Sequence, residues 1–233
     1  VKKAGIAKRE NTIDVSLLEF FVKEELNKTC PRVMVVTDAI KLIIINYPEG
    51  KHEMLEAINN PEDELQGKRE IVFSRNLYIE REDFRETANR KFFRLAIGKE
   101  VRLKNAYIIK AEKCIKNENG DVLEVHCTYD PKSKSGSNSE ESQRKVKGTI
   151  HWVDINSSID VKINEYDRLF LKEKPEESED LLKSVNTDSK KLIVGKSEKF
   201  VSSLTKGQKV QFQRKGYYIV DDNQQGSIFF NKT

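Results

Sequence analysis

Residues 91–113, KFFRLAIGKEVRLKNAYIIKAEK, combine a strand pattern with a cationic surface. Seven of these residues are basic and two are acidic. Because side chains alternate along a strand, Val101 and Leu103 fall on one face and leave Arg102 and Lys104 on the other. The stretch therefore predicts a half-buried strand with two cations on its outer face.

Aromatic residues precede this strand, since Phe92 and Phe93 stand next to Arg94. Aromatic and basic side chains together suit unstacked nucleic-acid bases and their phosphates. An ordinary solvated face of a half-buried strand has the same spacing, so the spacing alone does not separate the two interpretations.

Composition limits the class of protein. The 233 residues allow one large or two smaller domains, and the net charge of +4 means that a polyanion site depends on local clusters of Lys and Arg. Three dispersed cysteines favour reduced thiols over disulfides or a zinc site, and the three histidines add no metal pattern. No run approaches the roughly 20 apolar residues of a membrane helix. We expect a cytoplasmic protein without a metal or a membrane anchor, and, since the sequence opens on Val1, a fragment of a longer chain.

The first 90 residues predict a helix followed by strands. The helix runs to about residue 28, is capped by Asn11 or Thr12, and ends before Pro31. Its apolar stripe is Val15, Leu18, Val22 and Leu26. Further on we expect strands at 33–36, 41–46, 71–73 and 77–79, a connecting loop at 48–69, and a short helix or turn at 80–90.

The rest of the chain reads as a β meander. Asn119 and Gly120 predict a hairpin between 107–116 and 122–129. We expect a mobile loop at 131–143, a strand within 144–153, and two strands within 209–230 around a turn at 221–226. Many short strands with polar turns favour closed or nearly closed barrels.

Catalytic motifs are missing from the sequence. It contains no Gly-rich phosphate loop, no GxSxG and no HExxH, and its carboxylates are interleaved with Lys and Arg. We expect no independent active site.

Eight short sequence motifs, taken in order, resemble the C-terminal half of the glutaminyl-tRNA synthetase family. The resemblance covers essentially the whole chain. The motifs are PRVMVV (31–36), KREIVFS (68–74), IEREDF (79–84), FRLAIGKEVRLKNAY (93–107), HCTYDP (126–131), RKVKGTIHWV (144–153), YDRLF (166–170) and GYYIVD (216–221). The resemblance implies a mainly β fold with two β-barrels that grip the anticodon loop of glutamine tRNA. Residues 1–30 would end a helical subdomain, 31–65 and 155–233 would form the proximal barrel, and 66–154 the distal barrel.

The resemblance also implies what the chain lacks. The family's catalytic Rossmann domain, which uses ATP and Mg, belongs upstream, so this fragment would be no enzyme and would hold no cofactor of its own. Its partners would be glutamine tRNA and the catalytic domain of the same parent chain, and it would be a monomer.

Matching positions carry over the family's anticodon contacts. The central base would be contacted by Arg32, Gln211 and Arg214, the third base by Arg94, and the first base by Arg102 and Lys104. Lys104 stands where the family has arginine, and it lacks the planar fork of a bidentate contact. Lys91 and Phe93 flank Arg94 as candidates for supporting contacts, and Phe93 fits the core equally well.

Two alternatives remain open. One is the related anticodon domain of an archaeal or eukaryotic glutamyl-tRNA synthetase, which binding to glutamine or glutamate tRNA would separate. The other is a stand-alone RNA-binding barrel of ribosomal type.

Overall fold

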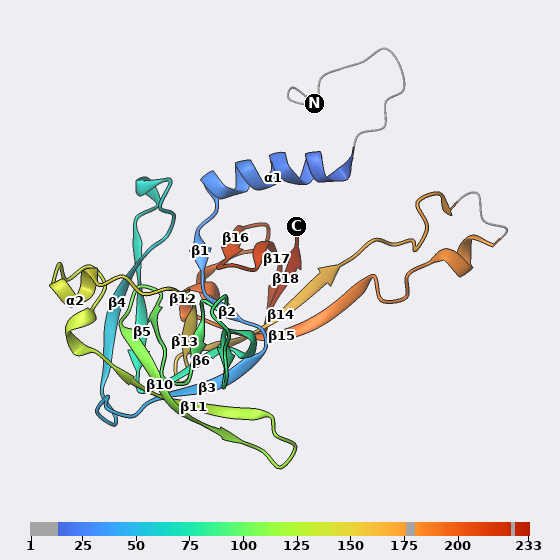
Figure 1. The fold of residues 1–233 in the computed structure, drawn as a ribbon. Coiled ribbons are helices and arrows are strands. Elements are labelled where there is room, and N and C mark those ends of the chain that lie inside the picture. Colours follow the sequence, from blue (N-terminus) through green and yellow to red (C-terminus); the bar gives the residue numbers. More distant parts are fainter. Residues whose placement is uncertain (1–13, 176–179, 225–226) are drawn as a thin grey trace.

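The computed structural model describes residues 14–175, 180–224 and 227–233. The fold is mainly β, with a helix before two nearly closed, barrel-like sheets (Figure 1), as the sequence predicted.

The leading helix α1 spans Val15–Thr29. Its N-cap is Asp14, whose side chain accepts a hydrogen bond from the backbone N–H of Ser16. The expectation of a cap at Asn11 or Thr12 is therefore wrong for this helix, and both residues lie outside the described part of the chain. Along the expected apolar stripe only Leu26 is buried.

The first sheet has seven strands. Their order is β1 (Arg32–Val33), β16 (Lys209–Phe212), β17 (Gly216–Gln224), β18 (Ser227–Lys232), β14 (Ile159–Tyr166), β15 (Lys190–Ser197) and β2 (Val35–Val36). The two edge strands, β1 and β2, are separated in the chain by Met34 alone. This short connection brings both edges of the sheet together around a core that includes Phe212, Tyr218 and Phe230.

The second sheet, also of seven strands, closes in the same way. Its order is β12 (Thr149–Ile150), β9 (Glu100–Leu103), β10 (Ile108–Lys116), β11 (Val122–Tyr129), β3 (Ala39–Ile44), β6 (Asn76–Glu80) and β13 (Trp152–Asp154). His151 alone separates the edge strands β12 and β13. Trp152 and Phe73 meet edge to face in the core, with their ring centroids 5.3 Å apart.

One strand, β3, pairs in a different sheet from the one expected. The other barrel limits stay a prediction. β3 lies within the range 31–65 that was assigned to the proximal barrel, but it pairs with β11 and β6 in the second sheet.

The expected connecting loop at 48–69 is wrong in large part. Strand β4 (His52–Ile58) pairs antiparallel with β5 (Lys68–Ser74) and forms a ribbon whose tip holds the 3₁₀ turn Glu64–Gln66. In β4 only Leu55 and Ala57 are buried, while the residues around them are polar or exposed. Two buried positions are too few for the period-two pattern to stand out in the sequence.

The Ser-rich segment 131–143, which was expected as a loop, contains short regular elements. It holds a 3₁₀ turn at Pro131–Ser133 and a short helix, α2, at Glu140–Gln143. Ser133 is fully buried, and its Oγ accepts a hydrogen bond from the backbone N–H of Ile108 at 2.8 Å. Such side-chain bonds to the backbone replace the missing hydrophobic anchors.

The remaining elements are short. They are the 3₁₀ turn Arg81–Asp83 within the expected helix or turn, the strand pair β7 (Phe84–Arg85) and β8 (Leu95–Ala96), and the 3₁₀ turns Leu181–Ser184 and Lys199–Ser203. At the C-terminal end three strands, β16 to β18, stand where two were expected, and β17 continues to Gln224 through the expected turn.

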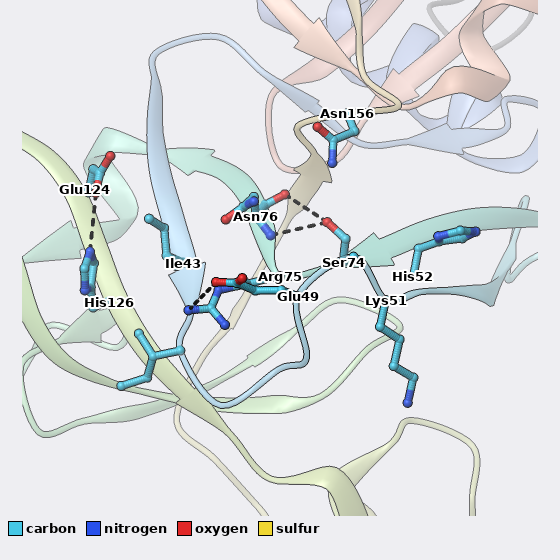
Figure 2. A pocket seen from close by; sticks show the side chains of 12 residues that line it. Ile43, Glu49, Lys51, His52, Ser74, Arg75, Asn76, Glu124, His126 and Asn156 are labelled. Atoms are coloured by element: carbon cyan, nitrogen blue, oxygen red, sulfur yellow. Dashed lines mark hydrogen bonds and ion pairs between the residues drawn. The ribbon is translucent and has the colours of Figure 1, made fainter.

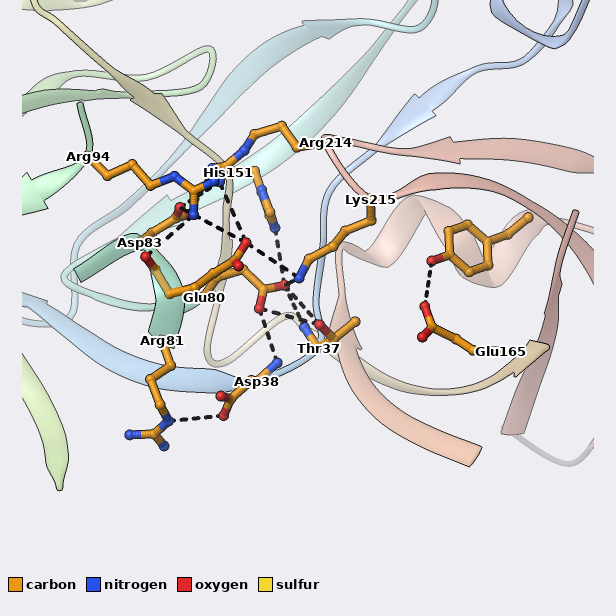
Figure 3. A network of polar contacts seen from close by, with 12 residues as sticks. Thr37, Asp38, Glu80, Arg81, Asp83, Arg94, His151, Glu165, Arg214 and Lys215 are labelled. Atoms are coloured by element: carbon orange, nitrogen blue, oxygen red, sulfur yellow. Dashed lines mark hydrogen bonds and ion pairs between the residues drawn. The ribbon is translucent and has the colours of Figure 1, made fainter. Parts of the chain in front are cut away.

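A buried carboxylate joins the two sheets, as Figure 3 shows. Glu80, at the end of β6, accepts hydrogen bonds from the backbone N–H groups of Thr37 at 2.8 Å and Asp38 at 3.2 Å. Lys215 Nζ lies 3.3 Å and His151 Nε2 3.5 Å from Glu80 Oε1. Burial alone would raise the pKa of Glu80, but these partners outweigh it and bring the pKa down to about 2.

Glu80 is expected to make the stability of the protein depend on acid. Its folded pKa of about 2 lies below the ordinary value of 4.5, so its stabilisation is complete above about pH 5 and is lost as the pH falls through 4.5 towards 2. The full contribution is on the order of 3 kcal/mol. Urea unfolding between pH 7 and pH 3 should show Glu80→Gln less stable at pH 7, with the difference from wild type narrowing below pH 4. A difference that stays constant over this range would contradict the assignment.

Candidate nucleic-acid interface

Arg32 and Gln211 come from opposite parts of the chain and meet in the first sheet. They are direct partners in the parallel pair β1–β16. Gln211 Nε2 donates to the hydroxyl of Tyr217 at 3.2 Å, and this hydroxyl donates to Asn27 Oδ1 at 3.2 Å. Arg32 Nη2 donates to the same Asn27 oxygen at 3.0 Å. The two predicted residues therefore share one polar network.

Arg32 is incompletely satisfied within this network. Its Nη2 lies 3.4 Å from Glu62 Oε1, while its Nε is buried and has no hydrogen-bond partner among the described residues. A buried donor without a partner costs free energy.

The positive charge of Arg32 acts electrostatically on Lys104. The residue as a whole is exposed, but protein atoms crowd its ammonium group: burial lowers the pKa of Lys104, and the positive charge of Arg32 lowers it further. Two cations held near each other favour an anion between them.

Arg94 and Arg214 meet at one carboxylate, as Figure 3 shows. Arg94 Nη1 lies 3.0 Å from Asp83 Oδ1, and Arg214 contacts both Asp83 oxygens, at 2.8 and 2.5 Å. Arg214 was expected beside Arg32 and Gln211. In the structure its guanidinium instead binds Asp83, next to Arg94.

Two hollows flank Phe93 and Arg94. One, of about 430 Å³, is lined by Lys91, Arg214 and Glu82 among others, and the other, of about 330 Å³, carries further cations. The cations of the second hollow are Arg90, Arg94, Lys99, Lys145 and Lys147. Phe93 is 54% exposed, which excludes the core interpretation and leaves an aromatic face in reach of solvent. Lys91 is exposed as well.

Gly148 allows the segment that carries Phe93 to pack closely. A Cβ at this position would lie 1.9 Å from the backbone oxygen of Phe93, well inside van der Waals contact. Only glycine lets the two backbones approach this closely.

Arg102 is used differently from the other predicted residues. Its guanidinium donates to the carbonyls of Ser133 at 3.0 Å and Ser142 at 2.7 Å, and to Ser135 Oγ at 3.3 Å. It holds the Ser-rich segment against β9.

A separate hollow of about 530 Å³ contains none of the predicted residues (Figure 2). Its lining carries two cations, Lys51 and Arg75, and two carboxylates, Glu49 and Glu124. These charges balance, so this hollow has less net positive charge than the hollows beside Arg94.

Sequence reasoning missed Asn27, Tyr217 and Asp83. The last two stand in the motifs GYYIVD and IEREDF, but nothing in their spacing indicates what they contact. Within the described ranges, no group of three or more His, Cys, Asp or Glu residues could hold a metal ion. None of the described helices is long and apolar enough to cross a membrane.

Comparison with known proteins gives two family matches. The profile described as "tRNA synthetases class I (E and Q), anti-codon binding domain" matches residues 30–130, and a second profile with the same description matches residues 149–221.

Curated relatives match along nearly the whole chain. The glutamine–tRNA ligase of Rhodopirellula baltica is 51% identical over 98% of this chain and 38% of its own length. The enzyme of Clostridium perfringens is 46% identical over 99% of this chain and 42% of its own length. The enzyme of Idiomarina loihiensis is 41% identical over 100% of this chain and 41% of its own length. The chain thus spans about 40% of the length of these relatives.

Proposed function

The chain belongs to the anticodon-binding domains of the class I tRNA synthetases for glutamate and glutamine, and from this premise we propose that it binds the anticodon loop of a glutamine tRNA. The relatives named above, at 41–51% identity, are glutamine–tRNA ligases, which favours glutamine over glutamate. A stand-alone ribosomal-type barrel finds no support in these matches.

The observation that supports this proposal most directly is the grouping of arginine and lysine side chains with exposed aromatic surface. Arg32 with Gln211 and Lys104 forms one group, and Arg94 with Arg214 and Phe93 forms the next. Single-stranded bases can be splayed into separate pockets, where Arg and Gln bond to base edges and aromatic rings stack. Lysine contacts to phosphates position the loop without reading it.

The two amino-acid specificities differ at the third anticodon base, which is guanine for glutamine and cytosine for glutamate. Arginine suits guanine, since its fork can donate to both O6 and N7. Arg94 is therefore proposed as the residue that selects glutamine tRNA. Arg32, Gln211 and Arg214 are proposed to contact the central uridine, and Lys104 and Arg102 to lie near the first base.

The wider activity belongs to the proposal as well. The parent protein would be a monomeric cytoplasmic enzyme that attaches glutamine to its tRNA with ATP and Mg in a catalytic domain. This chain would contribute recognition only, and would not activate glutamine when isolated.

Fluorescence anisotropy with labelled RNA hairpins tests the binding proposal. A hairpin with a glutamine anticodon should bind more tightly than the same hairpin with a glutamate anticodon, and affinity should fall steeply with salt as bound counterions are released. Equal binding of both hairpins and of a scrambled loop would overturn it.

Arg32→Ala should weaken binding of the glutamine hairpin by about 1–3 kcal/mol, because a charged contact to a base edge is lost. The loss should be smaller for a hairpin already changed at the central base, since one interaction can be lost only once. Lys110→Ala, which removes an exposed cation from β10, serves as the control. Equal weakening for every anticodon would reduce Arg32 to a phosphate contact.

A further inference from the structure

Asp83 contacts two of the predicted site arginines, Arg94 and Arg214. Among the described carboxylates it is the only one that does so while being fully buried. Its side chain is 0% exposed, and both oxygens are occupied by guanidiniums from two distant parts of the chain. A buried carboxylate is costly unless it is paired, so both arginines stabilise it. Since it reaches no solvent, Asp83 cannot contact a ligand itself.

Among the described residues the two arginines share no other buried partner, since Glu82, which also contacts both, is 57% exposed. Arg94 lies in the segment before β8, and Arg214 lies in the tight turn between β16 and β17 with a φ of 68°. Neither stands on a regular strand, so the direction of each guanidinium depends on its partner. Burial alone would lower the pKa of Arg214, but its hydrogen bonds and charge attraction to Asp83 outweigh this and raise the pKa.

Each guanidinium keeps donors free for a ligand. A guanidinium has five N–H groups. Asp83 receives bonds from two nitrogens of Arg214 and lies in ion-pair contact with one of Arg94. Both arginines line the hollow of about 430 Å³ beside the exposed ring of Phe93.

We propose that Asp83 is a positioning residue that fixes Arg94 and Arg214 side by side, and thereby couples the recognition of the third and central anticodon bases. This inference rests on the proposed function. Bidentate recognition needs the planar fork held in one orientation. A shared anchor makes the orientation of one fork depend on the other.

The test uses Asp83→Asn, which keeps the shape and removes the charge. Its affinity is measured by anisotropy against hairpins with the glutamine anticodon, a changed third base and a changed central base. Affinity for the glutamine hairpin should fall roughly tenfold or more, as expected for loss of a charge-assisted bond. The preference for the correct base should shrink at both positions.

Glu86→Gln is the matched control. Glu86 is an acid of the same part of the chain, is 53% exposed, and pairs with Lys116 rather than with either arginine. Removing this exposed negative charge should leave RNA binding unchanged. If Asp83→Asn strengthens binding or leaves it unchanged, Asp83 does not position the two arginines and the inference is wrong.

If Asp83→Asn reduces the preference for the correct base at only one of the two anticodon positions, the proposed coupling is also wrong. If wild type itself does not distinguish the hairpins, the proposed function fails rather than the role of Asp83.

A second measurement covers the case in which Asp83→Asn does not fold, which thermal unfolding would reveal. Arg94→Ala, Arg214→Ala and the double variant form a cycle in which residues with a common partner should be non-additive. The double variant should lose less affinity than the product of the two single losses. Additive losses would show that the two arginines act independently, against the proposal.

Discussion

Replacing Glu198 by alanine is expected to destabilise the protein by about 3–5 kcal/mol, the cost of breaking a buried ion pair by removing one partner. Arg69 and Glu198 are each 6% exposed and are joined by two hydrogen bonds, of 2.8 and 2.7 Å. Glu198 also accepts from the backbone N–H of Met34 at 2.6 Å. The variant leaves a guanidinium and an amide buried without this acceptor, in the region where the β4–β5 ribbon meets the first sheet.

Urea unfolding at pH 7 measures this loss. Glu56→Ala is the matched control, because Glu56 pairs with Lys68 on the same ribbon but is 72% exposed. An exposed pair contributes about 0–1 kcal/mol, so the control should remain close to wild type. Equal stability of the two variants would mean that the Arg69–Glu198 pair stabilises no more than a surface contact.

Gly148→Ala is expected to damage both stability and RNA binding. The new Cβ would lie 1.9 Å from the oxygen and 3.0 Å from the carbon of the Phe93 carbonyl, and backbone cannot move aside as a flexible side chain can. Overpacking of this kind costs about 1–3 kcal/mol. The displaced segment carries Arg94, so affinity for the glutamine hairpin should fall and the preference for the third base should be reduced.

Gly120→Ala separates the two effects. Gly120 lies at the tip of the β10–β11 hairpin with a φ of 86°, and a Cβ added there would meet no atom within 4 Å, so alanine is strained without a clash. It should destabilise the protein by about 1 kcal/mol and leave RNA binding unchanged. If Gly148→Ala binds the hairpin as Gly120→Ala does, the position of the Phe93 segment has no role in binding.

Local signals predicted the local elements. The Asn119–Gly120 turn predicted the β10–β11 hairpin, and the alternation around Arg102 predicted β9, in which Val101 and Leu103 are buried and Arg102 is half-buried. The β4–β5 ribbon was missed because most of its residues face solvent or other polar groups. The assignment of β3 failed because β11, its parallel partner, lies far along the chain.

The candidate site depended on resemblance more than on pattern. No periodicity could have paired Arg32 with Gln211, since closure of the first sheet alone brings them together. The resemblance placed Arg214 with them, whereas Asp83 binds it beside Arg94. The spacing of residues in the sequence does not indicate that a buried carboxylate pairs with these two arginines.

The single-residue connections that close the two sheets have a consequence for how the chain folds during synthesis. Every strand of the second sheet lies between residues 39 and 154, so all of its pairing partners are present once that stretch has left the ribosome. In the first sheet β2 pairs with β15 and β1 pairs with β16, while β18 lies between β17 and β14. The edge strands β2 and β1 must therefore wait, unpaired, until Lys190–Ser197 and Lys209–Phe212 have been made. The sheet is complete only with Ser227–Lys232, so its completion is the slow, long-range step of folding.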